Sequence, residues 1–359
     1  MNPPARRKLF IPGPVDVRPE IRELMSQPLI GHRSTEMTDL LNRIRPRLRT
    51  LMGTQNEVLV GTCSGSGLLE AAIRNLVKQR CLALTCGAFS ERWAQIARDC
   101  GREVKVVASK WGEPNLPDAL REQLKGGGFE AVLVVHNESS TGLTNPLEEI
   151  AAVMCEFPDV LFLVDAVTSL GGLPLEVDAL GIDVAIASAQ KALALPPGIA
   201  LASVSERAFE RAGKVTARGF YLDFLRMRES AEKGQTPSTP SIPHLFALDR
   251  QVEDILSEGL EQRWKRHAAL GERCRAWALE RFGLFPRQGY ESNTLTCIRN
   301  SRGVEVHRMR QALAAQGFVI SDGYGNLRQQ TFRIGHMGDL TENELQELLD
   351  VIDEVLEKL

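Results

Sequence analysis

An alternation of short apolar runs with longer segments of helical periodicity, beginning near residue 57, constrains the fold of this chain most strongly. Apolar residues at helical spacing, as in SGLLEAAIRNLV, predict helices, whereas short continuous apolar runs predict strands that are covered on both faces. Strands that alternate with helices indicate an α/β domain with a mainly parallel sheet. The predicted strands are EVLVG, CLALT, VKVVAS, AVLVV, LFLVDA, DVAIAS and IALASVS.

The pattern changes after about residue 235, where QTPSTPSIP is rich in turn residues. Helices are expected from His244 to about Phe282, and a last helix is expected after the capping box Thr341–Glu344. Between them we expect the strands NTLTCI and TFRIG, the helix VEVHRMRQALAAQG and the Gly-rich turn SDGYGN. We therefore predict an N-terminal segment (1–20), a large α/β domain (21–255) and a smaller α+β domain (256–359).

Composition and charge narrow the range of partners. A net charge of −3 gives no electrostatic reason to expect nucleic acid or an anionic membrane. The seven cysteines form no CxxC or Cys/His cluster, so we expect neither a disulfide framework nor a bound metal. No signal-peptide pattern and no apolar run of membrane-spanning length is present, and we expect a cytoplasmic protein.

Polar residues follow several of the predicted strands, where ligands of open α/β sheets bind. EVLVG leads into Thr62–Gly67, whose small and hydroxyl residues at a helix start suit a phosphate, although a plain Gly-rich helix cap fits as well. AVLVV leads into the polar run HNESSTG, and LFLVDA carries Asp165, which alone could be a helix cap or an ion-pair partner. Lys191 has no charged neighbour between Asp183 and Glu206, so it is either chemically reactive or a snorkelling surface lysine.

These features together match the needs of pyridoxal phosphate. The cofactor needs hydroxyl and N–H groups for its phosphate, a carboxylate for its pyridinium nitrogen and a lysine for its aldehyde. An apolar environment lowers the pKa of a lysine, which favours a nucleophilic amine.

The chain also resembles the class V aminotransferases of fold type I, in the group of alanine–glyoxylate and serine–pyruvate aminotransferases. The resemblance runs from IPGPVDV through GHRS to TFRIGHMG and is most specific in VDAVTSLGGLPLEVDALGIDVAIASAQKALALPPG. It implies an α/β fold with a mostly parallel seven-stranded sheet and a smaller C-terminal α+β domain. It also implies pyridoxal 5′-phosphate as the cofactor and a homodimer whose active sites are shared across the interface.

The resemblance further implies roles for single residues. Lys191 would form the Schiff base, Asp165 would pair with the pyridine nitrogen, and Arg333 would bind the substrate α-carboxylate through its planar fork. Phe89, where many relatives have Trp, and Val167 would pack on the two faces of the ring. The remaining implied site residues are Ser64, Gly65 and Ser66 at the phosphate, Ser139 at the ring hydroxyl, Gln190 near phosphate or ring, Thr236 and Thr239 at the neighbouring subunit's phosphate, and Gly13, His32 and Arg33 near the substrate.

The implied reaction is a ping-pong transamination from serine or alanine to glyoxylate or pyruvate. A phosphoserine, aspartate or aminophosphonate substrate would need a further cation, for which His32, Arg33 and Arg218 are candidates. The segment SDGYGN could act as a lid, since its glycines permit hinge motion.

Three other functions fit the sequence less well. A cysteine desulfurase needs a mobile, low-pKa cysteine, and Cys297 lies in a predicted strand. A catalytically silent dimer would usually have lost the lysine or the aspartate. A Rossmann dehydrogenase lacks its glycine fingerprint here.

Overall fold

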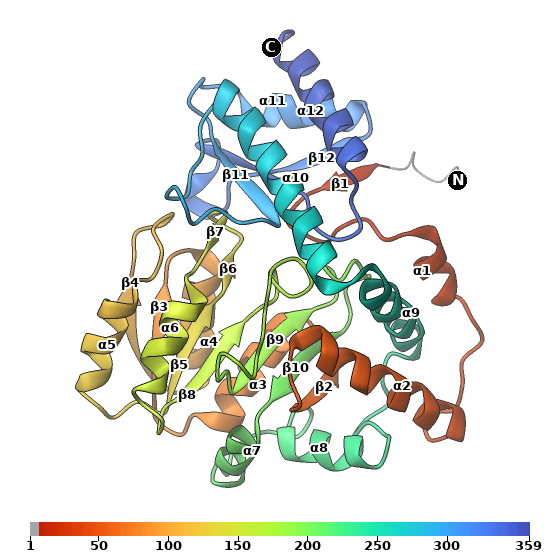
Figure 1. Cartoon of the computed structure of the whole chain (residues 1–359), viewed down its shortest axis with the longest axis vertical. Helices are drawn as coiled ribbons and strands as arrows, with labels where there is room; N and C mark the ends of the chain where they lie inside the picture. Colours follow the sequence, from red (N-terminus) through yellow and green to blue (C-terminus); the bar gives the residue numbers. More distant parts are fainter. Residues whose placement is uncertain (1–6) are drawn as a thin grey trace.

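The computed structural model describes residues 7–359 and consists of a large α/β layer structure with a smaller C-terminal unit above it (Figure 1). Its main sheet has seven strands, and each predicted apolar run forms one of them. β10 is antiparallel to both of its neighbours, whereas all other neighbouring strands are parallel, so the expected mainly parallel sheet is confirmed. The order is β2 (Glu57–Gly61), β10 (Ala200–Val204), β9 (Val184–Ser188), β8 (Leu161–Asp165), β5 (Ala131–Val135), β3 (Arg80–Thr85) and β4 (Glu103–Ala108).

Helices cover both faces of this sheet, which explains why most of its strands are continuously apolar, whereas the edge strand β4 has no fully buried residue. In β5, Val132 and Val134 belong to one buried cluster, and Ala131, Leu133 and Val135 belong to the other. One cluster packs under α2 (Thr35–Met52), α5 (Pro117–Lys125), α6 (Leu147–Cys155) and α9 (Ile242–Glu258), and the other under α3 (Gly65–Leu76), α4 (Ala88–Asp99), α7 (Glu206–Gly213) and α8 (Phe224–Glu232).

The smaller unit is a four-stranded sheet in the order β1 (Lys8–Phe10), β12 (Phe318–Asp322), β13 (Thr331–Gly335) and β11 (Leu295–Arg299). Its helices are α10 (Leu260–Arg281), α11 (Val306–Ala315) and α12 (Glu342–Leu356), as the periodicity predicts. α12 begins with the predicted capping box between Thr341 and Glu344. The structure adds β1, which pairs in parallel with β12, so that the start of the chain completes the C-terminal sheet.

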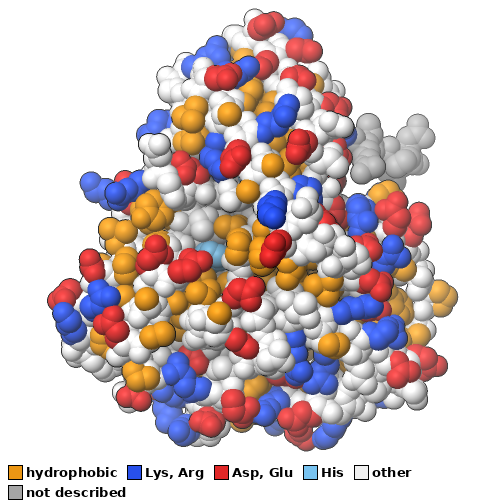
Figure 2. All heavy atoms as spheres, viewed as in Figure 1, with side chains coloured by type: hydrophobic (Ala, Val, Ile, Leu, Met, Phe, Trp, Pro, Cys, Tyr) orange, Lys and Arg blue, Asp and Glu red, His pale blue; other side chains and the backbone are white. Residues whose placement is uncertain are grey.

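The remaining elements are short connections. They are α1 (Pro19–Leu24), the ribbon of β6 (Asn137–Glu138) and β7 (Leu143–Thr144), and the 3₁₀ turn η1 (Gly325–Leu327). η1 begins in the predicted SDGYGN turn, whose first two residues belong to β12. Figure 2 shows basic and acidic side chains mixed over the visible face, in keeping with the small net charge. Among residues 7–359, no helix combines the length and the apolarity needed to cross a membrane.

Candidate active site

A cavity of about 250 Å³ lies at the carboxyl ends of β2, β3, β5, β8 and β9, where the sequence places its polar residues. It brings together most of the predicted site. Its lining includes Ser64, Gly65, Ser66, Phe89, Ser139, Asp165, Val167, Gln190 and Lys191, and it adds Leu69, Arg92, Val135, Asn137 and Thr168.

Lys191 follows β9 and brings its amine to this cavity. Its Nζ donates a hydrogen bond to the carbonyl of Pro12 and lies 6.0 Å from the centre of the Phe89 ring. Burial, and then the positive charge of Arg333, lower the pKa of Lys191 to about 8. A lysine amine with such a pKa is neutral, and therefore nucleophilic, over a larger range of pH than a surface lysine.

Gly13 lies against the stem of Lys191, which gives this predicted site residue a physical reason to be glycine. Its φ is +95°, and a Cβ there would approach Lys191 Cδ to 2.6 Å. Any side chain at this position would displace the lysine.

Asp165 ends β8 and is buried beside Lys191. One of its oxygens accepts a hydrogen bond from the backbone N–H of Val167 at 2.8 Å. Burial raises the pKa of Asp165 to about 7, because this hydrogen bond and the more distant cations compensate only part of the desolvation. A pyridinium N–H is the kind of partner that would restore its ionised form.

The start of α3 provides an open anion site on the cavity wall. Ser64 is the N-cap residue without a side-chain capping bond, and no acidic residue lies in the first turn. A Cβ on Gly65 would meet Val167 Cγ2 at 2.9 Å, so the close approach of helix and loop requires glycine. Free N–H groups, the helix dipole and the hydroxyls of Ser64 and Ser66 suit a phosphate group.

Arg333 on β13 is buried, and backbone carbonyls fix its orientation. Its Nε donates to Asp322 O at 3.2 Å and its Nη1 donates to Ser139 O at 3.0 Å. No carboxylate pairs with it among residues 7–359. Its remaining N–H groups are therefore available to a ligand carboxylate, and its Cζ lies 5.4 Å from the ring centre of Tyr324.

Six predicted residues are not part of the cavity lining. Gly13 and Arg333 are two of them, and the other four are His32, Arg33, Thr236 and Thr239. Arg33 donates to the backbone carbonyl of Thr236 at 2.8 Å, and Thr236 Oγ1 donates to Ser238 O at 2.8 Å. His32 is next to Arg33, and Thr239 follows Thr236 in the same loop. The four residues therefore form a group of their own, apart from the cavity of the single chain.

The other candidate cation, Arg218, is paired. It contacts Asp223 at 3.1 Å and two backbone carbonyls. His336 is fully buried with its Nε2 2.9 Å from Thr296 Oγ1, so it packs in the core behind β11 and β13.

Sequence reasoning missed Glu138, Arg92 and Tyr324. Glu138 is fully buried and accepts hydrogen bonds from the backbone N–H groups of Phe89 and Ser90, and from the Ser140 hydroxyl, at 3.1, 2.9 and 2.6 Å. It thereby caps the start of α4 and positions Phe89. Its place in the polar run HNESSTG marked the region, but nothing in the sequence connects it to a helix some 50 residues earlier.

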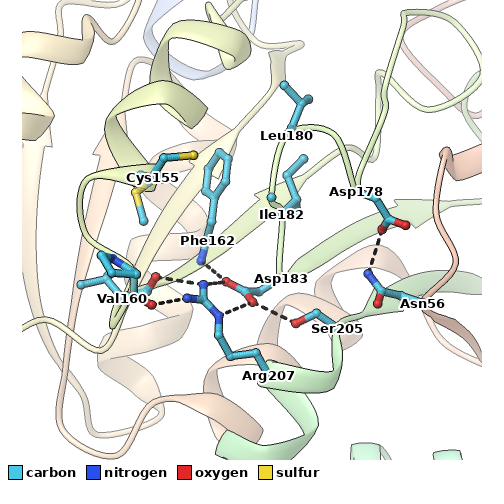
Figure 3. Close-up of a pocket in the computed structure, with 13 residues that line it drawn as sticks. Asn56, Cys155, Val160, Phe162, Asp178, Leu180, Ile182, Asp183, Ser205 and Arg207 are labelled. Carbon is cyan, nitrogen blue, oxygen red and sulfur yellow. Dashed lines mark hydrogen bonds and ion pairs between the residues drawn. The ribbon is translucent and has the colours of Figure 1, made fainter.

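A larger cavity of about 440 Å³ lies at the opposite edge of the sheet, near the amino ends of β8 and β9 (Figure 3). Its charged side chains are already satisfied. Asp183 accepts from Arg207 and from Ser205, and Asp178 accepts from Asn56 (Figure 3). We therefore assign the chemistry to the cavity around Lys191.

The seven-stranded sheet, the buried lysine and aspartate, and the helix-start anion site define a pyridoxal phosphate enzyme of fold type I. The model of the aminotransferase class-V family matches residues 23–348, and the chain belongs to this family. It is therefore a pyridoxal phosphate-dependent aminotransferase.

Named relatives agree with this assignment. The chain is 38% identical to an uncharacterized aminotransferase of Methanocaldococcus jannaschii, with 99% of this chain and 94% of the relative covered. It is 32% identical to a serine–glyoxylate aminotransferase of Methylorubrum extorquens, with 95% of this chain and 89% of the relative covered. The crystal structure of a Thermus thermophilus aspartate aminotransferase of subgroup IV superposes on this chain with a TM-score of 0.91 at 31% identity. The superposition covers 98% of this chain and 99% of the aspartate aminotransferase.

Proposed function

We propose that this enzyme transfers the amino group of a small amino acid, serine or alanine, to glyoxylate or pyruvate in a ping-pong reaction. The observation that carries the proposal is the Lys191 amine, whose pKa is near 8, in one cavity with Asp165 and the start of α3. The likeness to a serine–glyoxylate aminotransferase supports the choice of substrates.

In this proposal the cofactor's ring would lie between Phe89 and Val167, with its phosphate at Ser64, Gly65 and Ser66. Ser139 would bind the ring hydroxyl, and Gln190, which accepts from Ser188 Oγ at 2.6 Å, would face the phosphate or ring.

The residues divide the chemical work among them. Pyridoxal phosphate supplies an aldehyde that combines with amines and a protonated ring that takes up electrons when the substrate loses its Cα proton. Asp165 holds the proton on the ring nitrogen. The Lys191 amine would remove the Cα proton and would deliver a proton to the carbon of the former cofactor aldehyde. Arg333 would hold the α-carboxylate so that the Cα–H bond faces Lys191.

We further propose a cytoplasmic homodimer. Thr236 and Thr239 lie away from the cavity of their own chain, which supports their role at the neighbouring subunit's phosphate. Gly13 stays a substrate-side residue because it leaves room beside Lys191, and His32 and Arg33 would act together with the Thr236 segment.

Other substrates remain as alternatives. Aspartate, phosphoserine or an aminophosphonate would fit if a further cation faces the substrate side chain. A desulfurase role is disfavoured, because Cys297 is buried in β11 and burial raises the pKa of its thiol to about 11.

The test is the visible spectrum of the holoenzyme, titrated separately with alanine, serine, phosphoserine, aspartate and cysteine. We expect alanine or serine to bleach the cofactor band, and glyoxylate or pyruvate to restore it. Lys191→Ala should still fold but show no turnover. Turnover by that variant, or sulfide release from cysteine, would contradict the proposal.

A further inference from the structure

Arg92 stands at the cavity with its charge unneutralised by any acidic side chain. It lies at the start of the second turn of α4 and lines the cavity together with Lys191. Within residues 7–359 it forms no ion pair, and its Nη2 donates at 2.7 Å to the hydroxyl of Tyr324. Its guanidinium carbon lies 4.9 Å from the centre of the Phe89 ring.

Two carboxylates, the adjacent Glu91 and the buried Glu138, are occupied by other donors. Glu91 accepts from the indole N–H of Trp111 at 2.7 Å. Glu138 is surrounded by N–H and hydroxyl groups of residues 89, 90 and 140. The charge of Arg92 nevertheless reaches the reactive groups, since it contributes to lowering the pKa of Lys191.

Tyr324 connects Arg92 to the carboxylate-binding arginine. The guanidinium carbon of Arg333 lies 5.4 Å from the centre of the Tyr324 ring, whose hydroxyl receives the hydrogen bond from Arg92. The same ring packs against Phe89, with 5.3 Å between the ring centres. Two guanidinium groups thus contact a single aromatic side chain, and one of them, that of Arg92, lines the cavity.

This arrangement suits a substrate with two anionic ends. Arg333 is held by two carbonyls in one orientation, which fixes one carboxylate. Arg92 uses Nη2 to donate to Tyr324, and its remaining N–H groups can bind a second carboxylate. A monocarboxylic amino acid uses only the first of these groups.

We infer that Arg92 is a second anion-binding residue, which admits short dicarboxylic amino acids and 2-oxo acids to the active site besides the monocarboxylic ones. The inference rests on the proposed transamination and extends its substrate range. Tyr324 sets the separation of the two arginines, so it selects for a short chain between the two carboxylates.

The experiment compares wild-type holoenzyme with Arg92→Gln and Arg92→Lys, using aspartate and alanine as donors to glyoxylate. We expect the ratio of kcat/KM for aspartate to kcat/KM for alanine to fall about tenfold or more in Arg92→Gln, mainly through KM, because a charge-assisted contact is lost. The same ratio in Arg92→Lys should lie between the values of the wild type and of Arg92→Gln. Arg98→Gln, the same change two turns along the exposed side of α4, should leave the ratio and the activity unchanged.

A binding measurement separates affinity from turnover. Succinate and propionate, titrated against the absorbance of the bound cofactor, probe two carboxylates and one. We expect Arg92→Gln to weaken succinate binding about tenfold more than propionate binding.

The outcomes also distinguish the two proposals. If no amino acid bleaches the wild-type cofactor band, the proposed function fails. If alanine reacts but Arg92→Gln changes aspartate and alanine equally, or changes only phosphoserine turnover, the assignment of Arg92 to a dicarboxylic substrate is overturned while the transamination stands. The control against misfolding is the thermal unfolding midpoint of each variant.

Discussion

The pKa of Lys191 governs when its amine can react with the cofactor. Burial and the charge of Arg333 lower this pKa from 10.5 to about 8, so raising the pH through 8 increases the neutral, nucleophilic fraction. We expect the rate at which pyridoxal phosphate combines with the apoenzyme to rise from pH 7 to about pH 9 and then level off. The measurement is the growth of cofactor absorbance after mixing at a series of pH values.

The control for this profile is Nα-acetyl-lysine, whose amine has no such burial and whose rate should keep rising up to pH 10. A profile of the apoenzyme that rises in parallel with the free lysine derivative would show that the pKa of Lys191 is unshifted.

Lys191 and Asp165 could be predicted from the sequence because, together with the helix start at Ser64, they match the needs of one cofactor. Lys191 lacks charged neighbours and Asp165 ends an apolar strand, and neither feature alone decides between a structural and a chemical role. Arg92 gave no such signal, since its character comes from Tyr324, which lies more than 200 residues further along the chain. That Arg92 has no carboxylate partner among residues 7–359 can be recognised only from the folded structure.

At the scale of elements, Glu138 attaches the start of α4 to the end of β5. Glu138→Gln would replace one carboxylate oxygen with an NH₂ group that faces the N–H donors of Phe89, Ser90 or Ser140. We expect the free energy of unfolding to fall by about 2 kcal/mol, because a buried charged acceptor is lost. Unfolding of the apoenzyme in urea measures this change in the free energy of unfolding.

Glu149→Gln is the matched control, since Glu149 is an exposed acid in the first turn of α6. It should cost about 0.5 kcal/mol or less. Equal destabilisation by the two changes would show that Glu138 acts only as a general helix-start charge.

Element prediction succeeded where local pattern decides the outcome. β3, β5, β8, β9 and β10 are buried almost throughout, so their apolar runs are clear in the sequence. The edge strand β4 has only exposed and half-buried residues, and its β-branched valines carry the pattern there. β1 was not predicted, because three residues carry too little pattern and their pairing with β12 joins residues some 310 positions apart. The antiparallel direction of β10 likewise depends on a connection, not on composition.

At the scale of the whole molecule, the two units are joined by a charged network around Arg263, which is 2% exposed. Arg263 donates to the backbone carbonyls of Gly171 and of Ala192, the residue after Lys191, and pairs with Glu258 and Asp339. Arg18, near the start of the chain, pairs with Asp339 as well. The network therefore connects α10 and the loop after β13 to the segment that carries Lys191.

Arg263→Met keeps most of the side-chain volume but removes five N–H donors and one positive charge from this buried junction. Two carbonyls would lose their donor, and Asp339 would keep only Arg18 as a cationic partner. We expect the free energy of unfolding to fall by about 3 kcal/mol or more, since a buried ion pair is broken on one side. The urea midpoint of the apoenzyme reports this loss. Arg250→Met removes an exposed pair with Asp254 on α9 and should cost about 0.5 kcal/mol or less. Equal effects of the two substitutions would mean that solvent already screens the Arg263 network, and that the two units are held together by apolar packing alone.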